Sequence, residues 1–547
     1  MKTVVAAALG ECVHVAGVSR FLNLAEQAGW RVVFLGPATP IEVILDAAKR
    51  EKADLVGVSY RLTPENGESL LGEFAEEADE LRNQGVKFVF GGTPPVVDRV
   101  KKLNFFEALF DGTQHTTEII AYLRGHKISH EDKGLWPQNM IDRIKIKSPF
   151  PMIRHHYGLP GIQETITGVQ KIAEAEVLDV ISLGIDQDAQ ENFFHPERQE
   201  KRRMGAGGVP VRSPEDYRNL YDATRFGNFP LMRTYSGTDD FAQLAEMYVE
   251  AINIAWAAIP LYWFNQMDGR GPWDLEGSIR EHQKLMAWYG KRNIPVEANE
   301  AHHWGMRDAP DVIFVVSAYL AAYNAKVYGV KDHIIQLMFN SPAGTTAAMD
   351  IAKMLAVIKM TSRLETPEFR IWKQTRTGLL SYPVDLNQAK AHLAISIFNQ
   401  MALDPHIVHV VGYPEANHAV SADEVIESCV MAQKAIESAL ESKLDIIGSE
   451  KIQLRTQELV SEADFLLEAI QELGVDKSLD SLSDANLLAE AVFNGYLDAP
   501  QLINNPFGQG KIKTMIDHRG ACIVIDRETG QLINEETRIS QIQKRNK

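Results

Sequence analysis

Residues 3–17 read Thr-Val-Val-Ala-Ala-Ala-Leu-Gly-Glu-Cys-Val-His-Val-Ala-Gly, and this stretch decides the fold of the N-terminal part of the chain. Residues 3–9 form a short apolar run with the length of a buried strand, and residues 19–29 have a helical pattern. His14 is therefore expected on a strand-to-helix loop, outside the carboxyl end of the strand. Open α/β sheets bind their ligands at such loops.

Two further loops repeat this arrangement. The apolar residues 56–58 end at Ser59, and residues 88–90 end at Gly91-Gly92-Thr93. The remaining strands are predicted at residues 32–35 and 108–110, the latter followed by Asp111-Gly112-Thr113. Glycines at strand ends let the backbone approach a ligand closely. The pattern predicts a Rossmann-like (flavodoxin-like) domain over residues 1–128.

The ordered series His-x-x-Gly, Ser and Gly-Gly resembles the cobalamin-binding module of B12-dependent mutases and methionine synthase. The resemblance implies that His14 replaces the corrin's own base as the lower axial ligand of cobalt. It also implies that the other loops hold the nucleotide tail. The implied cofactor contacts are Glu11, Cys12, Val13, His14, Val15, Gly17, Ser59, Tyr60, Arg61, Gly91, Gly92, Thr93 and Gly112.

The chain departs from the family pattern at one point beside the ligand. The family motif is Asp-x-His-x-x-Gly, whereas Cys12 stands at the Asp position with Glu11 beside it. A ligating histidine is normally oriented through its second nitrogen, and the sequence leaves open which of the two residues does this. A flavodoxin-like domain with an incidental loop histidine is the alternative interpretation.

The composition is that of a large water-soluble enzyme. A chain of 547 residues is expected to hold two or three domains, and no apolar run approaches the ~20 residues of a membrane span. The start lacks the cleavage region of a signal peptide, and the three cysteines cannot form a disulfide framework, so we expect a reducing cytoplasm. The net charge of −17 disfavours nucleic acid as a partner. The cysteines form no Cys-x-x-x-Cys-x-x-Cys triplet, which argues against an iron–sulfur radical SAM enzyme.

The sequence after residue 148 predicts a (β/α)₈ TIM barrel. Residues 129–148 are polar and weakly periodic, and are predicted to be a linker. Apolar runs of strand length then alternate with amphipathic helices over residues 149–445, and residues 446–547 are predicted to be a small helical and α+β extension. The candidate strands are residues 152–154, 180–184, 231–235, 259–265, 295–300, 334–339, 369–374 and 407–412.

Polar side chains gather at the predicted strand ends of the barrel. Arg154 and Arg233 end the first and third strands. Because a guanidinium group makes bidentate contacts with a carboxylate, two arginines at one barrel mouth predict a carboxylated substrate. Glu297 and Glu300 are expected on opposite faces of the fifth strand.

From the barrel onward, the chain resembles the large subunit of glutamate mutase (methylaspartate mutase). The stretch Arg233-Thr-Tyr-Ser-Gly-Thr-Asp-Asp is similar to the family's Arg-His-Gly-Thr-Pro-Asp, whose arginine holds a substrate carboxylate. The closing motifs Ala491-Val-Phe-Asn-Gly-Tyr-Leu-Asp-Ala-Pro, Asn505-Pro-Phe-Gly and Asp517-His-Arg-Gly follow in the family's order. The family usually has its cobalamin domain as a separate subunit, whereas here it is fused in front of the barrel.

The resemblance implies a set of roles in the barrel. Arg154, Arg233, Thr234, Asn265 and Gln266 would bind the substrate. Glu300 and Glu415 would be the catalytic polar contacts to ribose or substrate, and His156 would contact the cofactor.

Three departures indicate a substrate other than glutamate. The family's third arginine falls near Gln190 or Phe193, and its amine-binding glutamate is replaced by Asn265 or Gln266. Its strand-eight lysine aligns with Gly412. Losing a cation and an anion changes which charges the pocket can pair.

The implied activity is an adenosylcobalamin-dependent radical mutase that rearranges the carbon skeleton of a small carboxylated, amino-acid-like substrate. A corrinoid methyltransferase is one alternative, but it would usually carry a helical bundle in front of the cobalamin module. A PLP-assisted aminomutase needs a Schiff-base lysine, and the loops offer no obvious one. A non-catalytic cobalamin sensor or carrier is the alternative outside enzymes.

The paired histidines His155-His156 and His302-His303 also raise the possibility of a metal site. Adjacent residues on a strand point to opposite faces, so a rim or substrate contact is the favoured interpretation. By analogy with the family, we expect a homodimer.

Overall fold

The computed structural model describes residues 2–114, 116–123, 125, 136–442, 444–474 and 480–546. It divides the chain into two units, Met1–Leu135 and Trp136–Lys547. The second unit begins near the middle of the predicted linker. Part of that linker, residues 129–135, lies outside the described residues.

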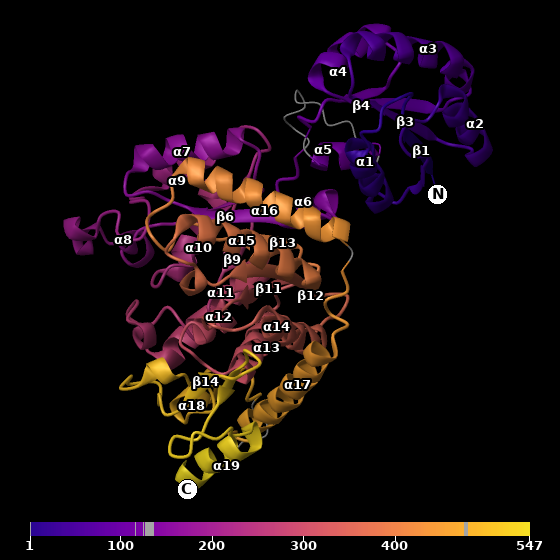
Figure 1. Cartoon of the computed structure of the whole chain (residues 1–547). Helices are drawn as coiled ribbons and strands as arrows, with labels where there is room; N and C mark the ends of the chain where they lie inside the picture. Colours follow the sequence, from indigo (N-terminus) through magenta and orange to yellow (C-terminus); the bar gives the residue numbers. More distant parts are fainter. Residues whose placement is uncertain are drawn as a thin grey trace. The chain divides into compact units, whose positions relative to one another are not determined.

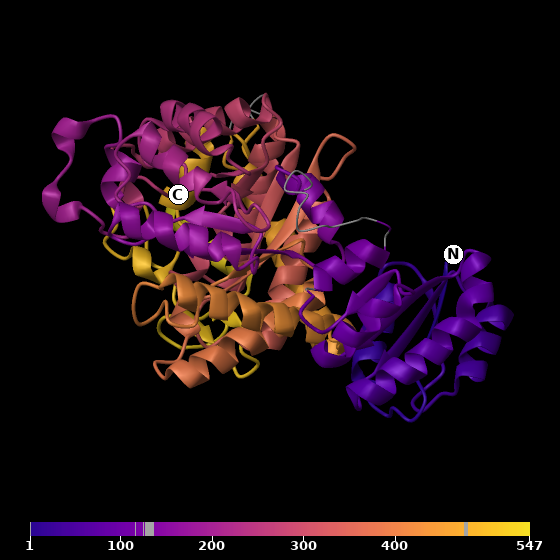
Figure 2. The same ribbon diagram turned by 90° about the horizontal axis from the view of Figure 1, so that it is seen from above.

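The N-terminal unit is a parallel five-stranded sheet in the order β2-β1-β3-β4-β5, the topology expected of a flavodoxin-like domain. The central strands β1 and β3 are buried at every position, because helices cover both faces of the sheet (Figure 2). Helices α1 and α5 pack together, and α2, α3 and α4 form a second packed group. The strands are β1 Thr3–Ala8, β2 Arg31–Phe34, β3 Leu55–Tyr60, β4 Lys87–Gly92 and β5 Ala108–Phe110. The helices are α1 Ala16–Gln27, α2 Ile41–Glu51, α3 Pro64–Asn83, α4 Pro94–Val100 and α5 Thr116–Leu123.

The second unit is built on a nearly closed barrel of eight parallel strands, in the order β8-β7-β6-β13-β12-β11-β10-β9 (Figure 1). Its seam is bridged by a hydrogen bond from the Ala255 N–H to the Met232 carbonyl (2.9 Å). The α/β class and the barrel predicted from the sequence are confirmed. The strands are β6 Met152–Tyr157, β7 Val180–Leu183, β8 Leu231–Arg233, β9 Ala257–Ala258, β10 Val296–Ala298, β11 Asp332–Phe339, β12 Arg370–Thr377 and β13 Ile407–Val410.

Helices follow the barrel strands along the chain. They are α7 Ile162–Glu174, α8 Gln187–Glu191, α9 Pro214–Asp222, α10 Phe241–Ile252, α11 Leu275–Gly290, α12 Glu300–Gly305, α13 Asp311–Val327, α14 Ala347–Ser362, α15 Leu386–Gln400 and α16 Ala422–Ser442.

Helix α6 (Met140–Lys147) replaces the C-terminal half of the predicted linker. The side chain of Asn139 caps it, and its apolar residues Met140 and Ile144 join a cluster with Met152, Trp256 and other residues from the amino ends of the strands. Its polar surface residues explain why the sequence suggested a linker. The helix closes the amino end of the barrel, so a ligand must enter at the carboxyl end.

The fourth and fifth strands are shorter than predicted. Residues 259–264 form a buried loop after β9, whose apolar side chains imitate a strand in the sequence. Glu300 starts helix α12 instead of ending β10, so the expectation that it faces away from Glu297 on one strand was wrong. His302 and His303 also lie on α12, so the strand argument about their faces does not apply.

The C-terminal extension packs on the barrel within the second unit. Helix α17 (Glu450–Gln471) contacts α13 and α14 along the barrel flank (Figure 1). Helix α18 (Ala485–Phe493) packs on α11, and α19 (Glu535–Asn546) packs on α17. Strands β14 (Thr514–Ile516) and β15 (Cys522–Val524) form an antiparallel hairpin.

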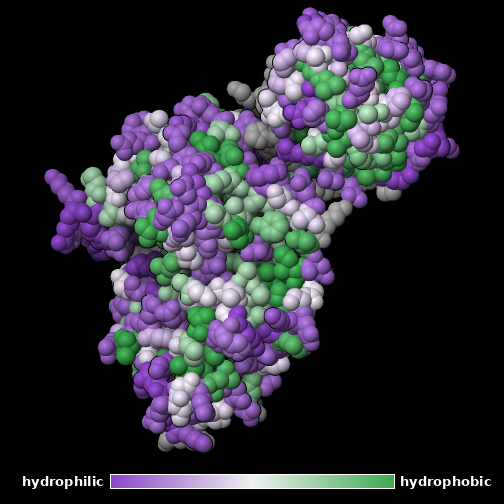
Figure 3. Space-filling view, viewed as in Figure 1, coloured by the Kyte–Doolittle hydropathy of each residue, from purple (hydrophilic) through white to green (hydrophobic). Residues whose placement is uncertain are grey.

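The surface of the second unit is mixed in character. Hydrophilic residues cover much of the face seen in Figure 3, with smaller hydrophobic patches between them. No helix within the described ranges is long and apolar enough to cross a membrane. All three cysteines are buried and free.

Close packing at the carboxyl ends of β6 and β7 generates a first prediction. A Cβ on Gly158 would lie 2.1 Å from the carbonyl oxygen of Gly184, whereas a Cβ on Gly184 would have its nearest contact at 3.8 Å. We expect Gly158→Ala to destabilise the barrel by about 1–3 kcal/mol, as overpacking does. Gly184→Ala is the matched control and should change stability by much less. Thermal unfolding of both variants measures the difference, and equal melting temperatures would contradict it.

Candidate functional site

The N-terminal unit holds a slot of about 310 Å³ at the carboxyl ends of β1, β3, β4 and β5. Ser59 is 5% exposed, and its hydroxyl is buried without a hydrogen-bond partner among the described residues. An unpaired buried hydroxyl is costly, so this atom indicates a ligand in the slot. Phe21 and Phe110 pack against each other beside it, with ring centroids 5.6 Å apart.

Eight of the predicted cofactor contacts line this slot together. They are His14, Gly17, Ser59, Arg61, Gly91, Gly92, Thr93 and Gly112. A Cβ on Gly17 would meet nothing within 4 Å, so the absence of a side chain there leaves open space. Glu11, Cys12, Val13, Val15 and Tyr60 do not line the slot. Sequence analysis missed Phe21, Phe110 and Gln114, which line the slot from α1, the end of β5 and the loop after β5.

The structure brings Cys12 to the second nitrogen of His14. The Cys12 Sγ lies 3.9 Å from the His14 Nδ1 and is fully buried, whereas Glu11 is exposed. The imidazole of His14 is itself exposed. Its Nε2 would be the nitrogen that binds cobalt, with the thiol at the position of the family's Asp. These residues and the glycine-lined slot fit a cobalamin.

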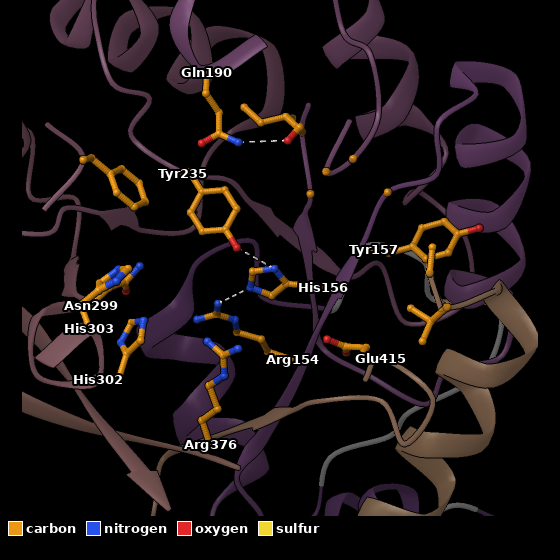
Figure 4. A pocket seen from close by; sticks show the side chains of 18 of the residues that line it. Arg154, His156, Tyr157, Gln190, Tyr235, Asn299, His302, His303, Arg376 and Glu415 are labelled. Carbon is orange, nitrogen blue, oxygen red and sulfur yellow. Dashed lines mark hydrogen bonds between the residues drawn. The ribbon is translucent and has the colours of Figure 1, made fainter. Parts of the chain in front are cut away.

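The barrel holds a larger pocket of about 560 Å³ at the carboxyl ends of its strands. Substrate sites of TIM barrels lie at this end. Of the predicted barrel residues, Arg154, His156 and Glu415 line the pocket (Figure 4). Arg233, Thr234, Asn265, Gln266 and Glu300 do not.

A polar layer crosses the barrel below the pocket. It consists of Arg154, Arg233, Glu297 and Gln374, which come from the alternate strands β6, β8, β10 and β12, as the layers of a TIM barrel do. The Glu297 Oε2 accepts hydrogen bonds from Arg154 Nη1 (2.7 Å), Arg233 Nη2 (2.8 Å) and the Trp256 indole (2.6 Å). Gln374 donates to Oε1 (3.0 Å). The two arginines predicted to clamp a substrate are therefore already bound to a carboxylate of the chain itself.

The ionisation of Glu297 follows from these contacts. Burial alone would raise its pKa, but the guanidinium groups of Arg154 and Arg233 and the indole hydrogen bond hold the pKa well below its ordinary value. Glu297 is fully buried and ionised. Its single negative charge balances one of the two positive charges of Arg154 and Arg233.

The hydrogen bonds of His156 fix its tautomer. Its Nε2 lies 2.9 Å from Arg154 Nη2, and its Nδ1 lies 2.9 Å from the Tyr235 hydroxyl. Because arginine can only donate, Nε2 accepts and the proton is on Nδ1. Nδ1–H therefore donates to the Tyr235 oxygen, and the Tyr235 proton is free for a ligand in the pocket. Burial, with Arg154 as the next cause, lowers the pKa of His156 well below its ordinary value, so the ring is neutral.

Other imidazoles surround the pocket in the neutral form. The rings of His156 and His409 stack with centroids 4.8 Å apart, and those of His302 and His303 with centroids 4.3 Å apart. Burial is the largest cause that lowers the pKa of each of these four rings. No group of three or more His, Cys, Asp or Glu side chains in the described ranges could hold a metal ion.

Glu415 and Glu300 differ in position. Glu415 lies on the rim, where its Oε1 accepts from the Gly412 N–H (2.6 Å) and lies 3.4 Å from the His155 Nε2. Glu300 is buried outside the pocket and accepts from the Tyr262 N–H and the Trp304 indole. Burial outweighs these hydrogen bonds and raises its pKa to about 7.

The remaining predicted substrate residues have structural partners. Asn265 bonds to Tyr262, Ser278 and Met267 and caps its own turn. Gln266 is exposed and donates to the Pro272 carbonyl. Thr234 donates to the Leu183 carbonyl.

Arg270, Asn299, Gln336 and Arg376 are polar residues of the pocket that the sequence analysis missed. Arg376 lies two residues beyond Gln374 on the same face of β12, and the predicted strand stopped before it. Asn299 and Gln336 are 4% and 3% exposed, and their side-chain oxygens have no partner among the described residues. The period-2 pattern, continued past the predicted strand end, would have found Arg376.

Residues 2–120 match the family model described as "B12 binding domain". The N-terminal unit is therefore a B12-binding domain, and the match supports cobalamin as the cofactor. The barrel lies outside the matched residues.

Three solved structures are similar to parts of this chain. A novel cobalamin-binding protein from Desulfitobacterium hafniense DCB-2 is 25% identical, over 22% of this chain and 58% of its own length, with a TM-score of 0.20. A type I 3-dehydroquinate dehydratase from Clostridium difficile is 11% identical over 52% of this chain and 92% of its own (TM-score 0.24). The cobalamin-dependent S-adenosylmethionine radical enzyme OxsB is 10% identical over 92% and 74% (TM-score 0.18).

The polar layer predicts a large effect of removing its carboxylate. Glu297→Gln leaves Arg154 and Arg233 as buried charges without an anion and should destabilise the barrel by about 3–5 kcal/mol. The pKa of Glu297 is lower in the folded state than in the unfolded state. Its carboxylate therefore stabilises the fold at any pH above its ordinary pKa, and this stabilisation is lost only when the pH falls to the pKa of the folded state. The loss should therefore be constant from pH 5 to 8 in denaturant unfolding. A penalty that vanishes within this range would contradict the assignment.

Glu300 predicts the opposite pH dependence. Its folded pKa of about 7 lies above its ordinary value of 4.5, so the folded state keeps a proton that the unfolded state loses. Wild-type stability should therefore fall as the pH rises from 4.5 to 7, and Glu300→Gln should remove this fall. Melting curves at pH 5, 6, 7 and 8 should show that the melting temperature of the variant, relative to that of the wild type, increases by a few degrees as the pH rises. Parallel curves for the two proteins would contradict the raised pKa.

Proposed function

We propose that this protein is an adenosylcobalamin-dependent radical mutase that rearranges the carbon skeleton of a small, carboxylated, amino-acid-like substrate other than glutamate. One observation carries the proposal. A chain with a B12-binding domain also contains a barrel pocket with more guanidinium groups than carboxylates nearby. Such a pocket suits a carboxylate ligand.

The barrel residues supply binding, orientation and exclusion of water. Arg154, Arg233 and Arg376 place three positive charges around the pocket floor, against one negative charge on Glu297. The Tyr235 hydroxyl can donate a hydrogen bond to the ligand. Helix α6 closes the other end of the barrel, so a substrate bound at the floor is shielded from water on that side.

The amino group of the substrate requires acceptors. The unpartnered oxygens of Asn299 and Gln336 line the same pocket, and Glu415 lies at its rim. Neutral amide oxygens replace the carboxylate that the glutamate mutase family uses for the amine, which supports a different amino acid.

The cofactor residues would act through position. His14 would hold cobalt from below, and the slot beside Ser59 would take the nucleotide tail. When bound, adenosylcobalamin supplies radical chemistry by homolysis of its carbon–cobalt bond, and the protein supplies the surroundings. The homodimer and the cytoplasmic location expected from the sequence stay predictions.

Reconstitution with adenosylcobalamin tests this proposal. The absorption spectrum of the wild-type complex should be that of a cobalamin with an imidazole in place of its own base, and His14→Ala should lose it. Small carboxylic acids, screened against the wild-type complex, should include one that changes the spectrum and is recovered as an isomer.

The control variant is His518→Ala, which changes an exposed histidine of the other unit and should leave the spectrum unaltered. An unchanged spectrum in His14→Ala would refute ligation by His14. A complex that responds to methyl donors and to no carboxylic acid would identify a methyltransferase instead.

A further inference from the structure

Three arginines line the barrel pocket, and two of them have partners. Arg154 is bound to Glu297, Gln374 and His156. Arg270 forms an ion pair with Asp268 and lies 3.8 Å from the ring centroid of Phe264. Arg376 forms no ion pair or hydrogen bond with a described residue, and its Nε is buried without a partner.

Arg233 does not compete for a ligand in this pocket. Its Nε and Nη1 also lack partners, but the side chain is 0% exposed and does not line the cavity. Its free nitrogens are sealed inside the polar layer. Arg376 is half-buried and borders the cavity directly.

Among the described residues no carboxylate forms an ion pair with Arg376, although Glu297 and Glu415 line the same pocket. In the β12–β13 register Arg376 lies beside His409, and His409 in turn lies beside Arg154. Burial and then Arg376 lower the pKa of His302, so that ring is neutral as well. Figure 4 shows the guanidinium groups of Arg154 and Arg376 below the ring of His156. Glu297 is bonded to Arg154 and Arg233, which leaves the charge of Arg376 without a bonded carboxylate.

We propose that Arg376 is the residue that binds the substrate carboxylate, and that Arg154 and Arg233 are positioning residues held by Glu297. This inference rests on the proposed function of the barrel as a site for carboxylated molecules. The carboxylate contact is thereby assigned to β12, whereas the two arginines predicted to bind the carboxylate lie on β6 and β8. One available guanidinium matches one carboxylate, so the substrate is an amino monocarboxylate and not a dicarboxylate.

Strands β11 and β10, which follow β12 in the sheet, supply acceptors for the amino group of such a molecule. Ala298, the last residue of β10, pairs with Ile335 of β11, and Asn299 and Gln336 are the residues that follow this pair on the two chain segments. Their unpartnered oxygens are neutral acceptors at neighbouring positions. An amino group can donate to these oxygens, whereas a carboxylate oxygen can only accept.

Binding to the chain without cobalamin tests this assignment. The probes are α-amino monocarboxylates of three to six carbons and the dicarboxylates aspartate and glutamate, ranked by thermal shift and then titrated by calorimetry. We expect a monocarboxylate to bind best. Arg376→Gln should weaken its binding at least tenfold, and Arg376→Lys should weaken it less, because it keeps the charge.

The matched control is Arg370→Gln, on the same strand, whose exposed arginine is paired with Asp332. It should bind the probe like the wild type. A positioning role for Arg376 would lower the melting temperature when its charge is removed. We instead expect Arg376→Gln to melt at or above the wild-type temperature, because it takes away an unpaired cation.

Three results would overturn the assignment: unchanged affinity in Arg376→Gln, tighter binding of a dicarboxylate, or no binding by any monocarboxylate of the panel. These results are independent of the cobalamin spectrum. A failed reconstitution would count against the mutase and leave the role of Arg376 standing.

Discussion

The carboxylate of Glu297, shared between Arg154 and Arg233 inside the barrel, is the interaction on which the second unit depends. A layer that is apolar in most barrels here contains two guanidinium groups, a carboxylate and an amide from four alternate strands. Each of these groups is costly to bury alone, and the layer is tolerated because every member bonds to another. The layer also orders what lies above it. Arg154 fixes the tautomer of His156, and His156 turns the Tyr235 proton toward the pocket.

Much of the architecture could be predicted from the sequence because it follows from patterns along the chain. The apolar runs of β1 and β3 and the glycines after β4 place a ligand slot without knowledge of any contact. For the barrel, the strand at residues 152–154 placed Arg154 at a strand end. Strand β6 continues to Tyr157, so Arg154 faces the interior instead. The end of a strand is difficult to predict where polar residues line the inside of a barrel, because polar residues in the sequence usually indicate a loop.

The partners across the barrel could not be predicted, because no local pattern relates residues that are many tens of positions apart. Glu297 was recognised as a strand residue, but its two arginines lie 143 and 64 positions away. The same limit applied to Asn265 and Glu300, because Asn265 bonds to Ser278 on α11 and Glu300 accepts from the Tyr262 N–H of the loop after β9. Beside His14, the spacing allowed both Glu11 and Cys12, and the turn of the backbone selects the buried thiol.

The electrostatics of the barrel link these observations. A pocket that must hold an anion needs positive charge, and positive charge without a partner weakens the empty protein. The polar layer separates these two demands, because Glu297 neutralises part of the charge of Arg154 and Arg233 and makes them structural. Arg376, one step closer to the mouth, then carries the charge that remains. The number of carboxylates on a ligand that the pocket can bind depends on how many of its cations have no carboxylate partner in the chain. It does not depend on the number of arginines in the sequence.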